Sequence, residues 1–203
     1  MVAIAVVGAS GQVGSRIVKE LSQRGHSVTA IARQPETLPS LPNVSAVKGD
    51  ITDTQAFIKT LAGHDVVVSA VKFTQVAPAT LIDAVKASGA KRYLVVGGAG
   101  SLEVAPGQLL VDQPEFPAEY LPEARAGLDF LNLLREEKGL NWTFLSPSAL
   151  FIAGERTGHF RLGKDTLLSN DQGSSISFED FAVALVDEIE KPAHPGQRFT
   201  VGY

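Results

Sequence analysis

Three glycines, Gly8, Gly11 and Gly14, separate an apolar run at the start of the chain from an amphipathic segment. The run Val2–Val7 has the β-branched composition of a buried strand, and Gln12–Arg24 places apolar side chains at helical spacing. Glycine weakens strands and helices, so three of them here indicate a tight turn or a close approach of another molecule. A strand, a G-x-x-G-x-x-G turn and a helix in this order favour a fold that begins with a βα unit.

Apolar β-branched runs and helical patterns alternate along the rest of the chain. This alternation is typical of right-handed βαβ units, and continuous apolar runs are typical of strands covered on both faces. The sequence therefore predicts an α/β fold: a doubly wound parallel sheet of the Rossmann type, in one domain over residues 1–203, with small C-terminal loops over a substrate. The expected strands are Val2–Val7, Ser27–Ala32, Val44–Lys48, Val66–Val71, Arg92–Val96, Trp142–Leu145 and Arg198–Val201, and the expected helices are Gln12–Arg24, Thr54–Ala62, Pro78–Ser88, Leu121–Lys138 and Ser177–Glu190.

Two long stretches, residues 98–119 and 149–175, show neither pattern. The first contains three prolines and the second four glycines. Loops of this length in a compact domain are usually functional, and both follow expected strands, at the edge where open α/β sheets bind ligands. We therefore expect a small-molecule substrate beneath these two loops.

Composition narrows the classes of function. The 203 residues carry 18 Lys and Arg against 22 Asp and Glu without a basic block, which argues against a nucleic acid or an anionic membrane as partner. Cysteine is absent, so disulfides, thiol nucleophiles and cysteine-based metal sites are excluded, and no His, Asp and Glu cluster has metal-site spacing. Without a basic leader or a long apolar stretch, we expect a cytoplasmic protein, either a monomer or a homodimer.

The glycine turn has the chemistry of a dinucleotide site. Gly8 can make the sharp turn, Gly11 can let a ligand approach the backbone, and Gly14 can let the helix pack closely on the strand. The N–H groups of the first helical turn then face a pyrophosphate. The alternative is a purely structural turn. The residues expected to contact the cofactor here are Gly8, Ser10, Gly11, Gln12, Val13 and Gly14.

The end of the second expected strand distinguishes between two cofactors. Sites for NAD place Asp or Glu there to hold the ribose 2′-OH. This chain instead has Arg33, whose guanidinium can bind a 2′-phosphate that a carboxylate would repel. We therefore expect NADP(H), with NAD(H) as the alternative if Arg33 is only a solvated surface residue. After the third strand, Asp50 and Ile51 either flank the adenine or, in the case of Asp50, only cap a turn.

Three segments, VVGASGQVGSRIVKELSQRGHSVTAIAR, VKGDITD and KRYLVVGGAGSL, resemble in order the motifs of the atypical branch of the short-chain dehydrogenase/reductase superfamily. That branch includes NmrA-like proteins, NADH-flavin reductases and biliverdin reductase B, which bind NAD(P)H. The stretch from PEFPAEYLPEARAGLDFLNLLR to LNWTFLSPSALFIAGERTGHFRLG also resembles a bacterial subgroup of flavin reductases or epimerases. The resemblance covers nearly the whole chain and implies a Rossmann fold and a nicotinamide cofactor, whereas the substrate stays open.

The resemblance also implies positions near the nicotinamide. At these positions Lys72 either touches a phosphate or a ribose hydroxyl of the cofactor or is simply solvated. Pro147 is expected to pack against the nicotinamide carboxamide, and Gly97 and Gly98 leave the backbone free of side chains, so that the nicotinamide can approach it. Each position can also be an ordinary turn residue. The implied residues follow the fourth, fifth and sixth strands: Ala70, Val71 and Lys72; Gly97 and Gly98; Ser146 and Pro147.

The catalytic residues implied by the superfamily are a serine and a Tyr-x-x-x-Lys pair. Ser101 lies near the serine position, and Tyr120 opens the corresponding helix, but Ala124 stands where the lysine belongs. Either Tyr120 only lines the pocket, or the reaction needs no strong enzymatic acid. Reduction of a flavin fits the second case, because hydride goes to the ring and solvent can supply the proton.

We therefore expect an NAD(P)H-dependent oxidoreductase, with NADP(H) preferred, that passes hydride to a flavin, a quinone or a similar conjugated acceptor. The alternatives are an NmrA-like redox sensor that binds NADP without turnover, and a sugar-nucleotide epimerase, which usually needs the Tyr–Lys pair. In the second long loop, Arg156 and Arg161 either bind an anionic tail such as the phosphate of FMN or pair with Glu155 and Asp165.

Overall fold

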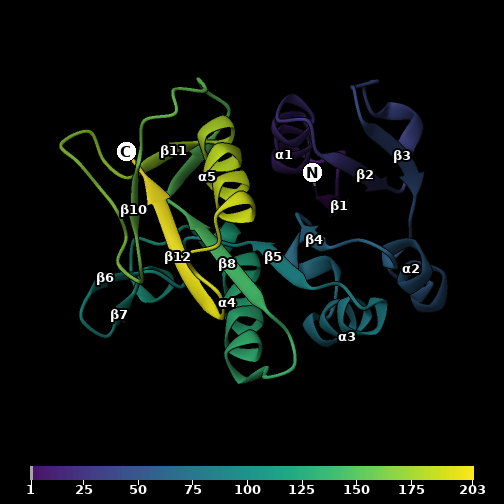
Figure 1. Cartoon of the computed structure of the whole chain (residues 1–203). Helices are drawn as coiled ribbons and strands as arrows, with labels where there is room; N and C mark the ends of the chain where they lie inside the picture. Colours follow the sequence, from purple (N-terminus) through teal and green to yellow (C-terminus); the bar gives the residue numbers. More distant parts are fainter. Residues whose placement is uncertain (1) are drawn as a thin grey trace.

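The computed structural model of the chain describes residues 2–203 and contains a central sheet of eight strands (Figure 1). All neighbouring strands pair in parallel, except that β10 runs antiparallel to β12 at one edge. The glycine turn follows β1, and the strand order reverses between β1 and β4, which is where doubly wound folds bind ligands. From one edge to the other, the strands are β10 (Arg161–Gly163), β12 (Gln197–Gly202), β8 (Trp142–Pro147), β5 (Arg92–Val96), β4 (Val66–Ser69), β1 (Ala3–Val7), β2 (Ser27–Ala32) and β3 (Val44–Lys48).

Helices cover both faces of this sheet, because its central strands carry apolar side chains on both sides. In β1, Ile4 and Val6 face one helical layer, and Ala5 and Val7 face the other. The doubly wound α/β fold predicted from the sequence is confirmed. The first layer contains α1 (Gln12–Gln23) and α5 (Phe178–Glu190), and the second contains α2 (Thr54–Leu61), α3 (Pro78–Ser88) and α4 (Leu121–Glu136).

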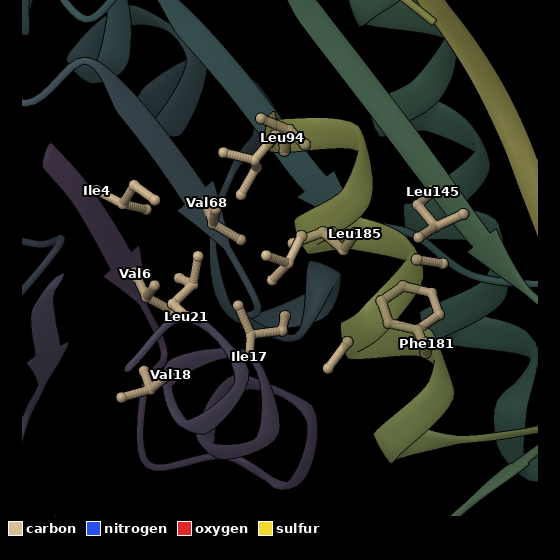
Figure 2. Packing of buried hydrophobic residues seen from close by; sticks show 14 of the residues in the cluster. Ile4, Val6, Ile17, Val18, Leu21, Val68, Leu94, Leu145, Phe181 and Leu185 are labelled. Atoms are coloured by element: carbon tan, nitrogen blue, oxygen red, sulfur yellow. The ribbon is translucent and has the colours of Figure 1, made fainter. Parts of the chain in front are cut away.

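The helices α1 and α5 pack side by side over the middle of the sheet, as Figure 2 shows. Ile17 and Leu21 of α1 lie beside Leu185 of α5, and all three side chains are fully buried. Burial of one such side chain contributes about 1.5–3 kcal/mol. This packing fixes the start of α1, and therefore the glycine turn, relative to the sheet.

The strand Val66–Val71 predicted from the sequence is too long at its C-terminal end. β4 stops at Ser69, whose partner in β1 is Val7, the last residue before the turn at Gly8. Past this point β1 gives way to the glycine turn, and although the Ala70 N–H still donates to the Val7 carbonyl oxygen at 2.9 Å, Ala70 and Val71 lie beyond the end of the strand. The residues released in this way become available to line a cavity.

The two stretches left without secondary structure by the sequence contain short elements. Their strands are only two or three residues long, so no periodicity marks them, and pairing with distant residues creates them. They also supply β10, the antiparallel edge strand that the parallel-sheet prediction lacked. Besides β10, the elements are β6 (Glu103–Ala105), β7 (Gln108–Leu109), β9 (Leu150–Ile152), β11 (Ser175–Ser177), which begins at the end of the second stretch, and the 3-10 turns Leu110–Asp112 and Ala118–Tyr120.

No helix within residues 2–203 combines the length and the apolar composition that a membrane crossing requires. Within the same residues, no group of three or more His, Asp and Glu side chains is arranged to hold a metal ion.

Candidate functional site

A first cavity of about 450 Å³ opens at the carboxyl edge of the sheet, next to the glycine turn. Four chain segments line it, each following the C-terminal end of a parallel strand, so it lies where the fold class predicts a ligand. The lining residues come from the ends of β1, β2, β3 and β4 and the turns after them: Val7, Gly8, Ser10, Gly11, Ile31, Ala32, Arg33, Gly49, Asp50, Ile51, Thr52, Ala70, Val71, Lys72, Gln75 and Val76.

The glycine turn places the start of α1 tightly against β1. Gly8 has a φ of +79°, and a Cβ there would lie 2.5 Å from the carbonyl oxygen of Ala70. A Cβ on Gly14 would collide with the carbonyl oxygen of Gly8. No side chain caps the N-terminus of α1, whose N-cap is Gly11. The turn therefore leaves backbone N–H groups available for an anion, and it fits a pyrophosphate.

Two exposed cations, Arg33 and Lys72, line this first cavity. Asp50 lies nearby, but its Oδ1 accepts hydrogen bonds from the Thr52 hydroxyl at 2.7 Å and the Thr52 N–H at 2.9 Å. These hydrogen bonds hold the pKa of Asp50 below its ordinary value. Asp50 is thus tied into a local turn, so Arg33 is available for an anionic ligand.

A side hollow of about 350 Å³ continues from the first cavity past Arg33. The first cavity and the side hollow share Ser10 and Arg33, and the hollow adds Gln34 and Thr37. Its lining therefore combines hydroxyl groups, an amide and a guanidinium. This is a donor set suited to a phosphate group.

A second cavity, of about 690 Å³, lies over the ends of β5 and β8. It meets the first cavity at the segment after β4, where Lys72 lines the first and Phe73 lines the second. Most of its surface is apolar, with Gln113, Glu115, Tyr120, Glu123 and Ser148 as polar members. The lining comprises Phe73, Gly97, Gly98, Ala99, Gly100, Val104, Leu110, Gln113, Glu115, Phe116, Pro117, Tyr120, Glu123, Ala124, Pro147, Ser148, Ala149 and Phe151.

The floor of the second cavity depends on glycines that leave room for larger neighbours. A Cβ on Gly97 would collide with the ring of Phe144, whereas one on Gly98 would meet open space. A Cβ on Gly100 would lie 2.9 Å from the Cβ of Ala124. Gly98 therefore presents bare backbone to the cavity, and α4 packs directly on the glycine run.

Phe73 is held in the wall of the second cavity by α4. The Oε1 of Glu123 accepts a hydrogen bond of 2.7 Å from the Phe73 N–H, and its Oε2 accepts two more from Thr74, from the N–H at 3.1 Å and the hydroxyl at 2.8 Å. The Phe73 ring stacks on Phe144, with centroids 6.0 Å apart and 17° between the planes. The aromatic wall is therefore fixed before any ligand binds.

Comparison with known proteins assigns the chain to a family. A family model described as NAD(P)H-binding matches residues 8–192. The chain belongs to this NAD(P)H-binding family. YwnB of Bacillus subtilis is 41% identical over 209 residues, which cover 98% of this chain and 97% of YwnB.

Two crystal structures are similar over the whole NAD(P)H-binding chain. A "putative epimerase" from Bacteroides thetaiotaomicron is 42% identical, with 100% of this chain and 98% of that chain covered and a TM-score of 0.95. A "putative NADH-flavin reductase" from Streptococcus pneumoniae is 37% identical, with 100% and 99% covered and a TM-score of 0.87. The predicted resemblance to NAD(P)H-binding reductases is thus confirmed at the level of the family.

The structure divides the predicted site residues of this NAD(P)H-binding protein into three groups. Nine line the first cavity: Gly8, Ser10, Gly11, Arg33, Asp50, Ile51, Ala70, Val71 and Lys72. Four line the second cavity: Gly97, Gly98, Tyr120 and Pro147. Five line neither cavity: Gln12, Val13, Gly14, Ser101 and Ser146.

Ser101 and Ser146 face Arg198 of β12 instead of a cavity. The Arg198 guanidinium donates to the Ser101 hydroxyl at 2.9 Å and to the Ser146 hydroxyl at 3.3 Å, and it pairs with Asp165. Burial lowers the pKa of Arg198, so its charge needs these partners. A buried cation, which the sequence pattern did not reveal, therefore holds both serines. Both serines therefore lie outside the two cavities, and their roles as a catalytic residue (Ser101) and a cofactor contact (Ser146) stay predictions.

Sequence reasoning also missed aromatic residues of the second cavity. Phe116 and Phe151 come from the two long loops, and Phe73 follows Lys72 directly. The position of Phe73, one residue beyond the predicted wall at Ala70–Lys72, is a signal that could have been used. Phe116 and Phe151 lie in segments without periodicity, so no local pattern marks them.

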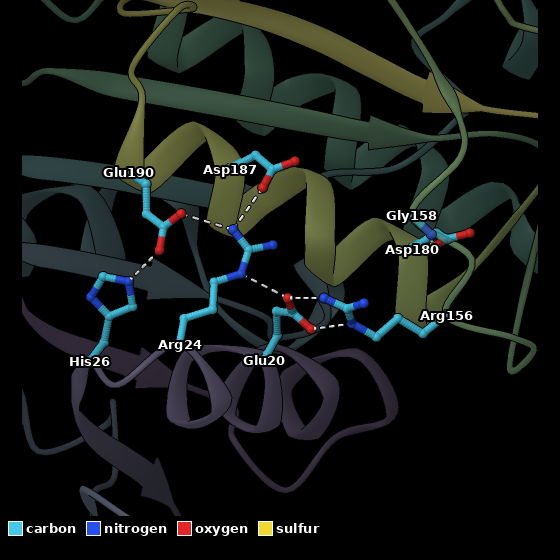
Figure 3. Close-up of polar contacts among 8 residues, drawn as sticks. All are labelled: Glu20, Arg24, His26, Arg156, Gly158, Asp180, Asp187 and Glu190. Carbon is cyan, nitrogen blue, oxygen red and sulfur yellow. Dashed lines mark hydrogen bonds and ion pairs between the residues drawn. The ribbon is translucent and has the colours of Figure 1, made fainter.

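The second long loop covers less of the site than predicted, because part of it is anchored on α1 and α5 (Figure 3). Arg156 donates two hydrogen bonds to Glu20, and the Gly158 N–H donates to buried Asp180 at 2.8 Å. Arg161 donates to the carbonyl oxygens of Ser169 and Tyr203. The structural role considered for Arg156 and Arg161 is therefore present, but with partners other than the predicted carboxylates.

Proposed function

We propose that this NAD(P)H-binding protein is a reductase that prefers NADP(H) and passes hydride to a flavin, a quinone or a similar conjugated acceptor. The observation that carries the proposal is the pair of cavities at one edge of the sheet. The first has an uncapped helix N-terminus and two exposed cations, whereas the second is apolar and aromatic. A phosphate-bearing cofactor suits the first cavity, and a flat ring suits the second.

The residues of the first cavity fit a dinucleotide phosphate. The backbone N–H groups after Gly11 would hold the pyrophosphate, and Arg33 with the side hollow would hold a 2′-phosphate. Ala70 and Val71 would lie along the ribose, in line with the wall expected from the family. When bound, a reduced nicotinamide supplies a hydride, and the acceptor takes it up together with one proton from water.

In the second cavity, the chain's own residues position the acceptor and limit its access to water. Phe73, Phe116 and Phe151 offer ring faces and edges against which a conjugated ring can pack. Gly98 presents backbone without a side chain, so the acceptor can lie close to the floor. Catalysis would then consist mainly of holding two rings in register.

Tyr120 contributes its phenol to the rim of the second cavity, where 59% of the residue is exposed. Ala124, at the position of the superfamily lysine, packs against Gly100 in the cavity wall. Within residues 2–203, no Lys, Arg or His contributes to the lining of this cavity. This arrangement supports an acceptor that solvent can protonate, and it disfavours an epimerase, which usually needs the Tyr–Lys pair.

The same absence of a Lys, Arg or His from the cavity lining within residues 2–203 is compatible with a second function, an NADP-binding redox sensor without turnover. The two functions separate in one experiment: purified protein is mixed with NADPH and either a flavin or a naphthoquinone, and the absorbance of reduced nicotinamide is followed. Acceptor-dependent loss of that absorbance is expected for the reductase. Tight NADPH binding, measured by nicotinamide fluorescence, without any such loss would favour the sensor.

A further inference from the structure

The second cavity carries negative charge and no positive charge. Among its polar lining residues, Glu115 and Glu123 are carboxylates, and Lys, Arg and His are absent from the lining within residues 2–203. The Glu123 carboxylate is held in place by its hydrogen bonds from Phe73 and Thr74. The Glu115 side chain is exposed at the cavity rim, where no hydrogen bond or ion pair within the described residues engages it. A ligand entering the cavity therefore meets one carboxylate held by hydrogen bonds and one exposed carboxylate.

The chain segment around the cavity also carries more negative than positive charge. From residue 93 to residue 124 the sequence contains no lysine or arginine. The same stretch carries five carboxylates: Glu103, Asp112, Glu115, Glu119 and Glu123. This segment supplies most of the cavity wall, and two of its carboxylates, Glu115 and Glu123, line the cavity itself.

Three cations of segments next to this cavity lie outside its lining. Arg125 of α4 pairs with Asp112 at 2.7 Å. Arg198, beneath the floor, has a side chain only 2% exposed and pairs with Asp165. Lys72 lines the first cavity. None of them contributes to the lining of the second cavity, so the charge of Glu115 and Glu123 is not neutralised there.

The two cavities differ in the charge of their lining residues, so each favours a different class of ligand. Arg33, Lys72 and the start of α1 attract phosphate groups, whereas the second cavity repels them. We propose that the second cavity selects planar acceptors without an anionic group, such as riboflavin or a neutral quinone, and discriminates against their phosphorylated or sulfonated forms. This proposal rests on the proposed function and names the substrate class of that site.

The test compares two flavins with the same ring system. Riboflavin is neutral, and FMN adds a phosphate ester with a charge of about −1.5 to −2 at neutral pH. With saturating NADPH and about 0.01 M salt, we expect kcat/KM to be roughly tenfold higher for riboflavin than for FMN. A ratio of this order is expected when a carboxylate repels a phosphate in a partly solvated cavity. The preference should shrink in about 1 M salt, where the Debye length falls to about 3 Å.

Two single variants localise the effect. Glu115→Gln should lower the ratio of kcat/KM for riboflavin to kcat/KM for FMN, and Glu115→Lys should bring this ratio below one. Glu119→Gln is the matched control, because Glu119 belongs to the same acidic segment but does not line the cavity. Its riboflavin-to-FMN ratio should stay within about twofold of the ratio for the unmodified protein, because a solvated charge farther from the ligand is strongly screened.

Equilibrium binding separates this proposal from the proposed function. Flavin fluorescence is titrated with protein saturated with NADP⁺, so no turnover is needed, and a neutral naphthoquinone with its sulfonated analogue forms a second pair of probes. If the neutral ligand of each pair binds more tightly than the anionic one, but NADPH is not consumed in the turnover assay, the charge selection is supported and the reductase is rejected. Equal or tighter binding of FMN and of the sulfonate would overturn the charge selection, even if both are reduced. Failure of every ring to bind would overturn it as well.

Discussion

Glu20 of α1 and Arg156 of the second long loop, 136 positions apart in the sequence, form a bidentate ion pair in which both hydrogen bonds are 2.8 Å long (Figure 3). Glu20 is buried and also accepts a hydrogen bond from Arg24, which in turn pairs with Asp187 and Glu190 of α5. The hydrogen bonds from Arg156 are the main reason that the pKa of Glu20 lies below its ordinary value. This contact therefore couples the loop to the layer of α1 and α5.

We expect Arg156→Gln to lower the free energy of unfolding by about 1–2 kcal/mol at neutral pH, because it weakens charged hydrogen bonds to a buried carboxylate from a half-exposed arginine. Glu20 is charged in the folded protein down to a lower pH than in the unfolded chain. Its stabilisation is therefore complete above its ordinary pKa and is lost as the pH falls through the lowered value.

The difference between the unmodified protein and Arg156→Gln should accordingly shrink between about pH 5 and pH 3, as measured by urea unfolding across that range. Glu155→Gln, at the adjacent exposed position, is the control and should change stability by less than about 0.5 kcal/mol. A difference between the two proteins that stays constant across this pH range would contradict the role given to Glu20.

Arg33→Ala should weaken NADPH binding by about 1.5–3 kcal/mol and leave NADH binding nearly unchanged, because only NADPH carries the 2′-phosphate. Titration of nicotinamide fluorescence measures both affinities. Lys59→Ala removes an exposed cation that does not line the first cavity, so it controls for a general loss of positive charge. Equal affinity of the unmodified protein for NADPH and NADH would refute the cofactor preference.

Tyr120→Phe should reduce kcat with a flavin or quinone by well under about 100-fold, since a general acid–base group typically contributes 10²–10⁴-fold. The physical reason is the absence of any cation from the cavity that the tyrosine lines. Steady-state kinetics, together with NADPH titration, test this. A larger loss of kcat with cofactor binding intact would show that another group activates the tyrosine. The result would then favour a carbonyl reductase or a dehydrogenase.

Ser101→Ala should act on stability and not on catalysis. Loss of the hydroxyl leaves the buried Arg198 guanidinium with one partner fewer, at a cost of about 1–3 kcal/mol in the free energy of unfolding. Thermal unfolding and kcat/KM are measured on the same preparation, and kcat/KM should stay within about twofold of the unmodified value, because a residue outside both cavities contacts neither ligand. A drop in kcat above tenfold with unchanged stability would instead support Ser101 as a catalytic residue.

The sequence by itself determined the first cavity, because its parts are local. Each lining segment directly follows a strand that is visible as an apolar run, and the turn from Gly8 to Gly14 carries its conformational requirements in consecutive residues. Parallel strands bring their carboxyl ends to one edge, so Arg33 and Lys72 could be assigned to the same site without knowledge of any contact between them. The sheet and its helices followed from the same patterns.

Only the tertiary structure decided the second cavity and the role of the buried charges. Phe73, Phe116 and Phe151 come together from three separate segments, two of which lack any periodicity. The partners of Arg156 and Arg198 lie far away in sequence, so the nearest carboxylates in the chain gave the wrong pairing for Arg156, and nothing local showed that Ser101 faces Arg198. Burial of charge requires whichever partner the packing supplies, and packing follows from the whole fold and not from neighbouring residues.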